Sequence, residues 1–569
     1  MKTELRNHCN TDVPTLCDDE EGNTAGGARR EPQVGVPEST NLSMRRNSVH
    51  ENRETPLVPL EDCSRGRLVK AYGRKTSMHA DGESDGPVVP VKQANNAGTT
   101  AAESVEGRGS TKGNAEQEAS RRTQCRISEL NGLDRVRRVA KRDKGVRLTA
   151  LLHHVTVDLL RESFFALKRD AAPGLDGVMW QEYEKDLETR LPELHGSIHR
   201  GTYRAVPSRR VWIPKADGRQ RPLGIASLED KIVQGAVRTV LECIYENDFL
   251  GFSYGFRPGR NQHNALDALT VALHRRHINW VLDADIRGFF DAIDHVWLMK
   301  FLEHRIGDRR VLRLIRKWLR AGVVEEGRKQ RTVQGTPQGA VISPLLANVF
   351  LHYVLDLWVH QWRTRHARGD VVIVRYADDF VMGFQYQEDA QRCLAALHTR
   401  MAHFGLSLHP DKTRLIEFGR YAAERRRRRG QPKPETFDFL GFTHCCGRTC
   451  AGAYAVIRKS IAKRLRAKLQ VIKMELRRRM HAPVAATGAW LQSVVRGWLN
   501  YHAVPFNYPR LEAFTREVGR LWRHTLRRRS HKGRRLTWAR FQRLLDRWIP
   551  KPAILHPHPY ERFAVSHPR

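Results

Sequence analysis

The chain has 569 residues, with 98 Lys and Arg against 62 Asp and Glu, and a net charge of +36. This length exceeds one ordinary core, so several domains are expected, and the positive charge favours a polyanionic partner, with nucleic acid first and an anionic membrane surface as the alternative. No stretch approaches the roughly 20 apolar residues that span a bilayer, and the N-terminus lacks the apolar core of a secretory signal. These features predict no membrane insertion.

Nine irregularly spaced cysteines indicate free thiols in a reducing compartment such as the cytoplasm. Cys445, Cys446 and Cys450 lie near His444 and raise the alternative of a zinc site. They lack the C-x2-C spacing of a closed tetrahedral site, so we favour ordinary thiols.

Residues 1–125 are rich in polar residues and Gly, with sparse apolar residues and no sustained period. This composition predicts a disordered polar extension. Because the segment mixes both charge signs, a basic arm that touches RNA and a plain tail remain equal alternatives.

A folded pattern begins at about residue 126. Leu148 to Leu167 has a helical period, and Ala171 to Gly177 is a turn-rich loop. Arg210 to Ile213 is a short predicted strand, followed by a basic turn from Lys215 to Arg221. Ser227 begins a capping box, and the helix after it carries one apolar face. That face comprises Ile232, Val233, Ala236, Val237, Val240, Leu241 and Ile244.

Two later segments combine strand patterns with carboxylates. The strand predicted at Trp280 to Ile286 carries Asp283 and Asp285 at alternate positions, which puts both on one face. The run from Val371 to Met382 reads as a hairpin with Asp378 and Asp379 at its tip. Past Cys450 the pattern turns helical and very basic, with Trp490, Trp498 and Trp522 spread through it.

Carboxylates brought together from these strands need a counter-charge to stay ionised. Magnesium supplies it, because it prefers oxygen ligands and leaves sites open for substrate phosphates. Two such ions about 4 Å apart would activate a 3′ oxygen and stabilise a leaving pyrophosphate. Spacing alone leaves open whether Asp283 or Asp285 takes part. Asp291 and Asp294 are expected to begin a helix and not to bind metal.

The segments Tyr376–Asp379 and Asp285–Asp291 resemble the catalytic box and the first carboxylate motif of the reverse transcriptases encoded by group II introns, which also act as maturases. The resemblance, and not spacing, selects Asp285 over Asp283. It implies that Asp285, Asp378 and Asp379 are catalytic, and that the main-chain carbonyl of Ile286 completes a metal shell. It also implies that Phe290 is the gate that rejects ribonucleotides.

Further blocks follow in the order of the same family. Trp212 to Lys215 and Arg221 to Ile225 are similar to its fingers segment, where Lys215 and Arg221 would hold the triphosphate. Gln334 to Gly339, followed by Ser343 to Leu346, resembles the block that lies against nucleotide and template, with Gln338 at the nucleotide and glycines that allow close approach to the substrate. Leu408 to Thr413 resembles the next block, where Lys412 would protonate the leaving pyrophosphate. Phe439 to Phe442 resembles the primer grip. For each single basic residue, a solvated surface charge is the alternative.

The resemblance continues into the basic C-terminal part. Arg496 to His502 and Leu526 to Trp538 resemble the maturase domain, whose basic helices suit RNA. The candidate RNA-binding residues are Arg520, Arg527, Arg528 and Lys532. Most of the Trp residues are expected in a core, and Arg425 to Arg429 in a charged loop. The alternative is a helical bundle whose charges only keep it soluble.

Many family members carry a C-terminal endonuclease with paired cysteines and histidines. The last cysteine here is Cys450, and Pro550 to Arg569 is too short for that domain. The chain therefore resembles the endonuclease-lacking kind, which would need another primer source such as a nascent replication strand.

Together the resemblance implies an α+β right-hand polymerase, with fingers and palm at 126–450, an α-helical thumb and maturase domain at 451–540, and a tail at 541–569. Its expected partners are intron RNA, an RNA template with a DNA primer, target DNA and deoxynucleoside triphosphates, with two Mg²⁺ ions as cofactors. Two rivals remain: an RNA-binding maturase that no longer polymerises, and a reverse transcriptase adapted to defence or to a CRISPR system. The intact carboxylates argue against the first, and the maturase-like thumb argues against the second.

Overall fold

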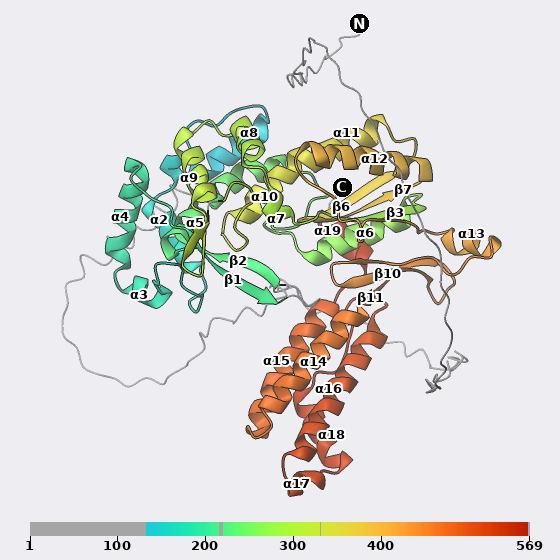
Figure 1. Ribbon diagram of the computed structural model, residues 1–569. Helices are drawn as coiled ribbons and strands as arrows, with labels where there is room; N and C mark the ends of the chain where they lie inside the picture. The colour runs from blue at the N-terminus through green and yellow to red at the C-terminus, as the bar shows by residue number, and fades with distance from the viewer. Residues whose placement is uncertain (1–131, 215–219, 331, 567–569) are drawn as a thin grey trace, which may run out of the picture. The chain divides into compact units, whose positions relative to one another are not determined.

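The computed structural model describes residues 132–214, 220–330 and 332–566. Within these ranges, three β-sheets pack with α-helices in an α+β arrangement (Figure 1), as the sequence predicts. The extension at 1–125 and Lys215 lie outside the described residues. None of the helices described combines the length and the apolar composition needed to cross a bilayer.

The central sheet carries the predicted carboxylates. Its strand order is β6-β7-β3-β8, and all its pairs are antiparallel. The strands are β3 (Trp280–Asp285), β6 (Val371–Tyr376), β7 (Asp379–Phe384) and β8 (Arg414–Glu417).

Alternate residues of this sheet enter two separate cores. Leu282 and Met382 belong to a core that includes helix α12 (Gln387–His403), which lies against β3 and β7 (Figure 1). Val281 and Val381 belong to a second core, with helix α6 (Gln262–Arg275). Asp283 and Asp285 follow the alternation of Val281, so they share one face, as predicted.

A second sheet has the order β2-β1-β4-β5. Its strands are β1 (Ser208–Pro214), β2 (Gln220–Ile225), β4 (Val323–Glu325) and β5 (Arg328–Gln330), and β1 includes the strand predicted at Arg210–Ile213. Helix α5 (Leu228–Asp248) begins as predicted, because the Ser227 side chain accepts a hydrogen bond from the Asp230 amide. The whole predicted apolar face of α5 is buried.

The remaining helices of this part surround the first two sheets. They are η1 (Leu152–His154), α2 (Val157–Phe165), α3 (Trp180–Lys185), α4 (Leu187–Arg200), α7 (Phe289–Ala292), α8 (His295–Arg305), α9 (Arg309–Arg320), α10 (Ser343–Leu351), the π-helical turn η2 (His352–Asp356) and α11 (Leu357–Arg365). The helical period predicted over Leu148–Leu167 is broken, because Leu148 pairs with Ile306 in an isolated bridge and the α-helix begins only at Val157.

The third sheet, β9 (Phe437–Phe439), β10 (Phe442–Arg448) and β11 (Tyr454–Ser460), leads into the C-terminal helices. The chain past Cys450 was expected to be helical, but β11 pairs with β10 along its whole length. Helix formation starts at Ala462, after the last apolar alternation of the hairpin. Arg425 to Arg429 was expected as a loop, yet helix α13 (Ala422–Arg428) forms there, because the buried Glu417 pairs with Arg425 and Arg429.

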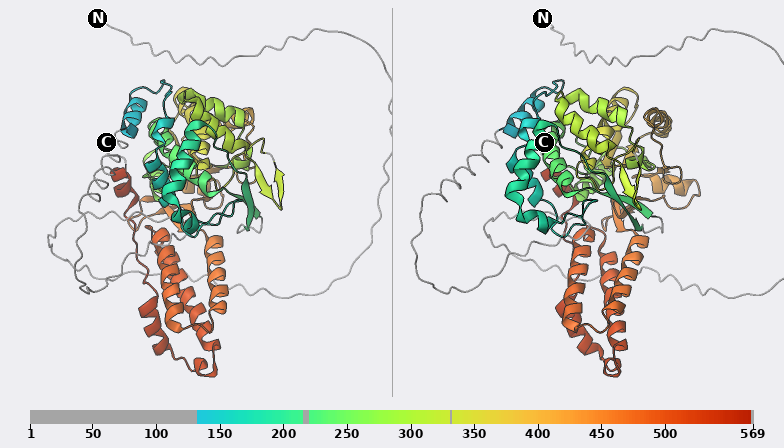
Figure 2. Two further views of the ribbon diagram at one scale, coloured as in Figure 1. Left: turned by 90° about the vertical axis from the view of Figure 1, so that its left-hand side faces the viewer. Right: turned by 60° about the vertical axis from the view of Figure 1, so that its left-hand side comes forward.

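The C-terminal helices are α14 (Ala462–Arg478), α15 (Val484–His502), α16 (Tyr508–Arg528), α17 (His531–Arg534), α18 (Trp538–Trp548) and α19 (Pro559–Ser566). The longer ones run side by side in both views of Figure 2, where they are coloured orange to red. Their own core contains Trp498 and Trp522, and Trp490 packs against it, so the expectation of core tryptophans is confirmed for these three.

Candidate active site

The hairpin between β6 and β7 has a two-residue turn, Ala377-Asp378, because Tyr376 pairs directly with Asp379. Ala377 has φ +56°, a conformation that a residue with a Cβ adopts at a cost of order 1–3 kcal/mol. The surroundings hold it there. Gly255 packs so closely that a Cβ added to it would lie 2.3 Å from the Ala377 amide nitrogen. The turn is thus a strained feature kept in place by the core, which is typical of functional sites.

The three predicted carboxylates come together at this turn. Asp285 at the end of β3 lies directly opposite Asp379 at the start of β7, and Asp378 occupies the turn before it. Burial raises the pKa of Asp378. Although Asp379 is reachable by solvent, the protein atoms around it and the neighbouring Asp378 and Asp285 carboxylates raise its pKa to about 7. This cluster therefore favours an added positive charge.

Lys412 provides one such charge. The segment after β3 pairs with the chain at Leu408, since the His409 amide donates to the Asp285 carbonyl (2.8 Å) and the Arg287 amide donates to the Ser407 carbonyl (2.9 Å). This pairing brings the Lys412 ammonium onto the Asp285 carboxylate, with which it forms an ion pair. Lys412 therefore lies at the carboxylate cluster.

The donor set has the chemistry of a magnesium site: hard oxygen ligands that need a cation to stay ionised together. In the present side-chain arrangement, the described residues hold no group of three His, Cys, Asp or Glu close enough to bind one ion. The carboxylates would fit magnesium by their chemistry, with Asp285 at present in an ion pair with Lys412. The Asp285 carbonyl and the Arg287 amide both take part in this backbone pairing. The Ile286 carbonyl lies between these two bonded groups along the chain.

Three further carboxylates in or after β3 have partners of their own. Asp283, on the same face as Asp285, forms an ion pair with Arg414 at 3.6 Å, and burial raises its pKa to about 6. Asp294 caps α8 by accepting from the Trp297 amide (2.8 Å), as expected. Asp291 lies in the first turn of the short helix α7, in line with the expectation that it begins a helix, and its carboxylate accepts from Gln338.

Arg221 and Gln338, both predicted at the nucleotide, are direct neighbours. The Arg221 Nε donates to the Gln338 Oε1 at 2.6 Å, joining strand β2 to the loop before α10. The glycines of that loop were expected to approach substrate. The close approaches that the structure contains are to protein backbone: a Cβ on Gly335 would lie 2.9 Å from the Phe290 carbonyl oxygen.

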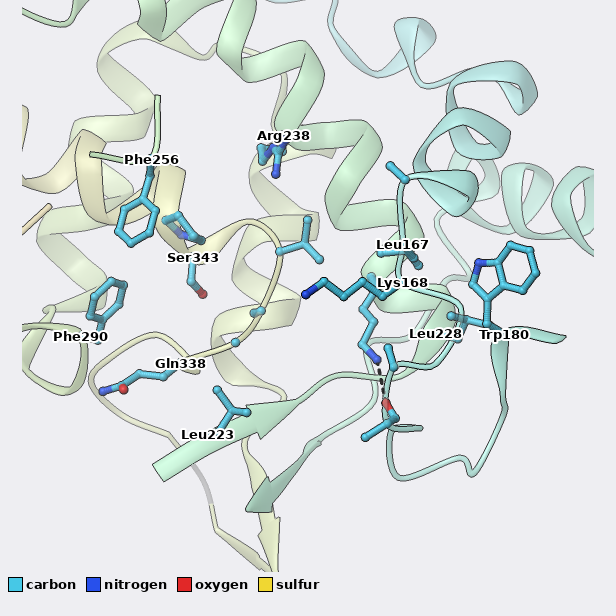
Figure 3. A pocket seen from close by; sticks show the side chains of 18 of the residues that line it. Leu167, Lys168, Trp180, Leu223, Leu228, Arg238, Phe256, Phe290, Gln338 and Ser343 are labelled. Atoms are coloured by element: carbon cyan, nitrogen blue, oxygen red, sulfur yellow. Dashed lines mark hydrogen bonds between the residues drawn. The ribbon is translucent and has the colours of Figure 1, made fainter. Parts of the chain in front are cut away.

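A cavity of about 870 Å³ opens next to this pair. Phe256, Phe290 and Gln338 line one end, Trp180 lies at the other, and Lys168 extends into the space between (Figure 3). Arg221, Lys231 and Arg238 add further positive charge to the lining. Phe290 is almost wholly buried, with 9% of its surface exposed, and it lines the cavity. The position suits a gate beside a phosphate-bearing ligand.

Comparison with known proteins agrees with this geometry. Residues 213–444 match the family described as reverse transcriptase (RNA-dependent DNA polymerase). Protein YkfC of Escherichia coli is 34% identical over 314 residues, which cover 48% of this chain and 81% of YkfC. The chain belongs to the reverse transcriptase family. Its class, an RNA-directed DNA polymerase with the right-hand polymerase fold, is thereby confirmed.

This reverse transcriptase also matches intron-encoded relatives. The group II intron-encoded protein LtrA of Lactococcus lactis is 42% identical over 182 residues, which cover 32% of this chain and 30% of LtrA. A 91 kDa protein in the cob intron of Schizosaccharomyces pombe is 30% identical over 304 residues, 51% of this chain and 37% of that protein. The chain spans about a third of the length of each of these two. The resemblance to group II intron-encoded reverse transcriptases is confirmed.

The C-terminal helices of the reverse transcriptase join the third sheet at the predicted primer grip. The turn of Phe439–Phe442 has positive φ at both Leu440 and Gly441. The Tyr501 hydroxyl on α15 donates to the Leu440 carbonyl at 2.7 Å. The four predicted RNA-binding residues are all exposed: Arg520, Arg527 and Arg528 on α16 and Lys532 on α17. Arg520 pairs with Glu517 at 2.8 Å.

Among the described residues, the cysteines near His444 form no cluster that could hold a metal ion. His444 is fully buried and stacks on Phe437 with ring centroids 4.8 Å apart. Cys446 exchanges hydrogen bonds with the backbone of Gly419.

Sequence reasoning missed the buried groups that support the catalytic turn. Arg375 in β6 donates to the Ala377 carbonyl (2.9 Å), to the Asn348 side-chain oxygen (3.0 Å) and to the Ser253 hydroxyl (2.7 Å). Asn348 in turn donates to the Gly255 carbonyl at 2.7 Å. The available signal was a lone arginine in an apolar strand, which must find partners when buried.

Proposed function

We propose that this reverse transcriptase extends a DNA 3′ end on an RNA template by two-metal nucleotidyl transfer, and that its C-terminal helices bind intron RNA in splicing and mobility. One observation carries the catalytic part. Asp285 and Asp379 face each other across paired strands, with Asp378 in the turn between β6 and β7. Strand pairing fixes the backbone positions of Asp285 and Asp379, so only their side chains would need to turn for a metal ion to bind.

Asp285, Asp378, Asp379 and the Ile286 carbonyl would hold the magnesium ions. Bound there, magnesium supplies the positive charge that favours an ionised 3′ oxygen and a leaving pyrophosphate. The support is electrostatic: the raised pKa values of Asp378 and Asp379 mark a cluster that lacks enough positive charge.

Lys412 would serve the leaving group. Its ammonium lies at the Asp285 carboxylate, close to where the triphosphate meets the carboxylates. With Asp285 holding a metal ion, Lys412 would be free to donate a proton to the pyrophosphate oxygen. The same lysine thus offers Asp285 a counter-charge before substrate arrives.

The cavity beside Phe290 would take the incoming deoxynucleotide with the template base. Arg221 and Gln338 lie at its edge, and the family resemblance adds Lys215, which is outside the described residues, as a third triphosphate ligand. Phe290 lines the cavity, so the 2′ hydroxyl of a ribonucleotide bound there would meet its ring. Positive charge from Lys168, Lys231 and Arg238 suits the template backbone.

The domain bounds are proposed from the sequence resemblance, and the boundary at 450 falls between the paired strands β10 and β11. Fingers and palm, 126–450, would contain the first two sheets, and the thumb and maturase domain, 451–540, would contain α14 to α17. Helix α18 completes the core of the C-terminal helices beyond residue 540. Exposed arginines and lysines on α16 and α17 support RNA binding through phosphate contacts. The cysteines in the described part of the chain are all free, with Cys450 exposed, and free thiols suit a reducing cytoplasm.

Primer extension on poly(rA) with oligo(dT) tests the polymerase, and a splicing assay with the RNA of the intron that flanks the gene tests the maturase. We expect magnesium-dependent extension and faster splicing at low magnesium. RNA binding without extension would favour the non-polymerising maturase. Extension without any effect on splicing, in a gene with no intron RNA around it, would favour a reverse transcriptase adapted to defence.

A further inference from the structure

The loop 334–339 is tied to two elements at once. On one side, the Thr336 amide donates to the Phe290 carbonyl and the Gly335 amide to the Ile293 carbonyl, both at 2.8 Å. On the other side, the Gly224 amide of β2 donates to the Gln338 carbonyl at 2.7 Å. The loop therefore holds helix α7 and strand β2 at a fixed separation.

Glycine is required at the first of these contacts. Gly335 has φ +85°, and a Cβ there would lie 2.9 Å from the Phe290 oxygen and 3.0 Å from the Asp291 Cα. The His295 ring nitrogen also bonds the Gly335 carbonyl at 2.6 Å. These contacts set the register between Asp291 and Gln338, three residues beyond Gly335.

The Gln338 side chain joins both sides of the loop. Its Oε1 accepts from Arg221, while its Nε2 donates to Asp291 at 3.3 and 3.5 Å. An amide has an acceptor end and a donor end of nearly the same shape. A carboxylate only accepts, so Asp291 selects the rotamer in which the oxygen faces the Arg221 guanidinium.

We infer that Asp291 is a positioning residue for nucleotide binding: it fixes the orientation of the Gln338 amide and, through that amide, the Arg221 guanidinium. This inference rests on the proposed role of Arg221 and Gln338 toward a deoxynucleoside triphosphate. Asp291 itself lies outside the magnesium-binding set. Its carboxylate is exposed in the free protein, so replacing it leaves no buried group unpaired.

The test measures steady-state dTTP kinetics on poly(rA)–oligo(dT) for Asp291→Ala and Asp291→Asn. Losing the acceptor should raise KM for dTTP about tenfold with a smaller change in kcat, the size expected for one hydrogen bond to a charged group. Asn keeps an accepting oxygen, so D291N should recover most of the affinity. Gly335→Ala, which shifts the register of the same pair, should raise KM as well.

A double-mutant cycle separates positioning from a general structural effect. In a Gln338→Ala background, D291A should change KM no further, since the amide it orients is gone. A KM that is unchanged in D291A, or a loss that persists in full in the Q338A background, would overturn the inference. Circular dichroism melting of each variant controls for folding.

The same experiments keep this inference apart from the proposed function. If Asp285→Asn still extends primers, the assignment of the metal site fails while the coupling between Asp291 and Gln338 can hold. If D285N is inactive and the cycle shows no coupling, the proposed chemistry stands and the positioning role of Asp291 falls.

Discussion

Arg375 and Asp356 form a bidentate ion pair beneath the catalytic turn. The Arg375 Nε and Nη2 atoms lie 2.7 and 2.6 Å from the two carboxylate oxygens of Asp356, and both side chains are fully buried. The pair aligns the guanidinium whose third nitrogen holds the Ala377 carbonyl. The position of Asp378 and Asp379 thus depends on an acid contributed by the π-helical turn η2.

Removing that acid should destabilise the fold strongly. Asp356→Ala leaves a buried guanidinium without its counter-charge, so we expect a loss of about 3–5 kcal/mol in the free energy of unfolding. The matched control is Glu303→Ala, which breaks the exposed pair with Arg316 and should cost less than about 1 kcal/mol. Urea unfolding followed by circular dichroism compares the two. Equal midpoints would contradict a structural role for the buried pair.

Loss of one metal ligand should abolish polymerisation without unfolding the chain. Asp378→Asn and Asp285→Asn keep the size of the side chain but remove the charge that a magnesium ion needs. Primer extension should disappear, while melting temperature and RNA binding stay close to those of the wild type. Extension near the wild-type rate in either variant would remove these residues from the catalytic set.

Magnesium should stabilise the protein more at pH 8 than at pH 6. The folded pKa of Asp379, about 7, lies above its usual 3.8. Protonation therefore favours the folded state at low pH, and this contribution is lost as pH rises through about 7. Above that pH, a magnesium ion would supply the positive charge that the proton on Asp379 supplies at lower pH. The measurement is the rise in melting temperature with magnesium at both pH values, at constant ionic strength, with Asp379→Asn as control. An equal rise at both would refute the competition between proton and metal.

Opening the gate should admit ribonucleotides. Phe290→Ala or Phe290→Val creates space beside the 2′ carbon of the sugar, so the ratio of kcat/KM for dTTP to that for UTP should fall by at least about tenfold. Phe289→Leu, a buried neighbour that does not line the cavity, is the control for a general packing defect. If discrimination is retained in both Phe290 variants, Phe290 is only a core aromatic.

Neutralising the exposed charges of α16 and α17 should separate RNA binding from chemistry. Replacing Arg527 and Arg528 with Gln should weaken intron RNA binding and flatten the slope of log affinity against log salt by roughly 0.7–0.9 per lost phosphate contact. Arg365→Gln with Arg368→Gln, an equally exposed pair near the end of α11, is the charge-matched control. The full set of substitutions also neutralises Arg520 and Lys532. Equal loss of intron binding and of extension on a short generic template would leave only an ordinary basic thumb.

Local sequence patterns determined the elements that carry the site. Alternation in Trp280–Ile286 and the apolar runs around Asp378 and Asp379 specify strands and a hairpin, because side-chain period and turn length are properties of short segments. The capping serine and apolar face of α5 were readable for the same reason. The family resemblance carried by the order of the motifs gave Asp285 and Phe290 their proposed roles. Spacing alone could not choose between Asp283 and Asp285.

Tertiary structure alone decided which groups meet across long sequence separations. Lys412 reaches Asp285 only after the segment at Leu408 pairs beyond β3, and Asp291 reaches Gln338 only because Gly335 lets two backbones touch. The partner of Arg375 could not be named in advance, since any acid brought to it by folding would satisfy the same charge. Sequence period fixes which face a residue occupies, whereas the packing of distant elements determines what that face meets.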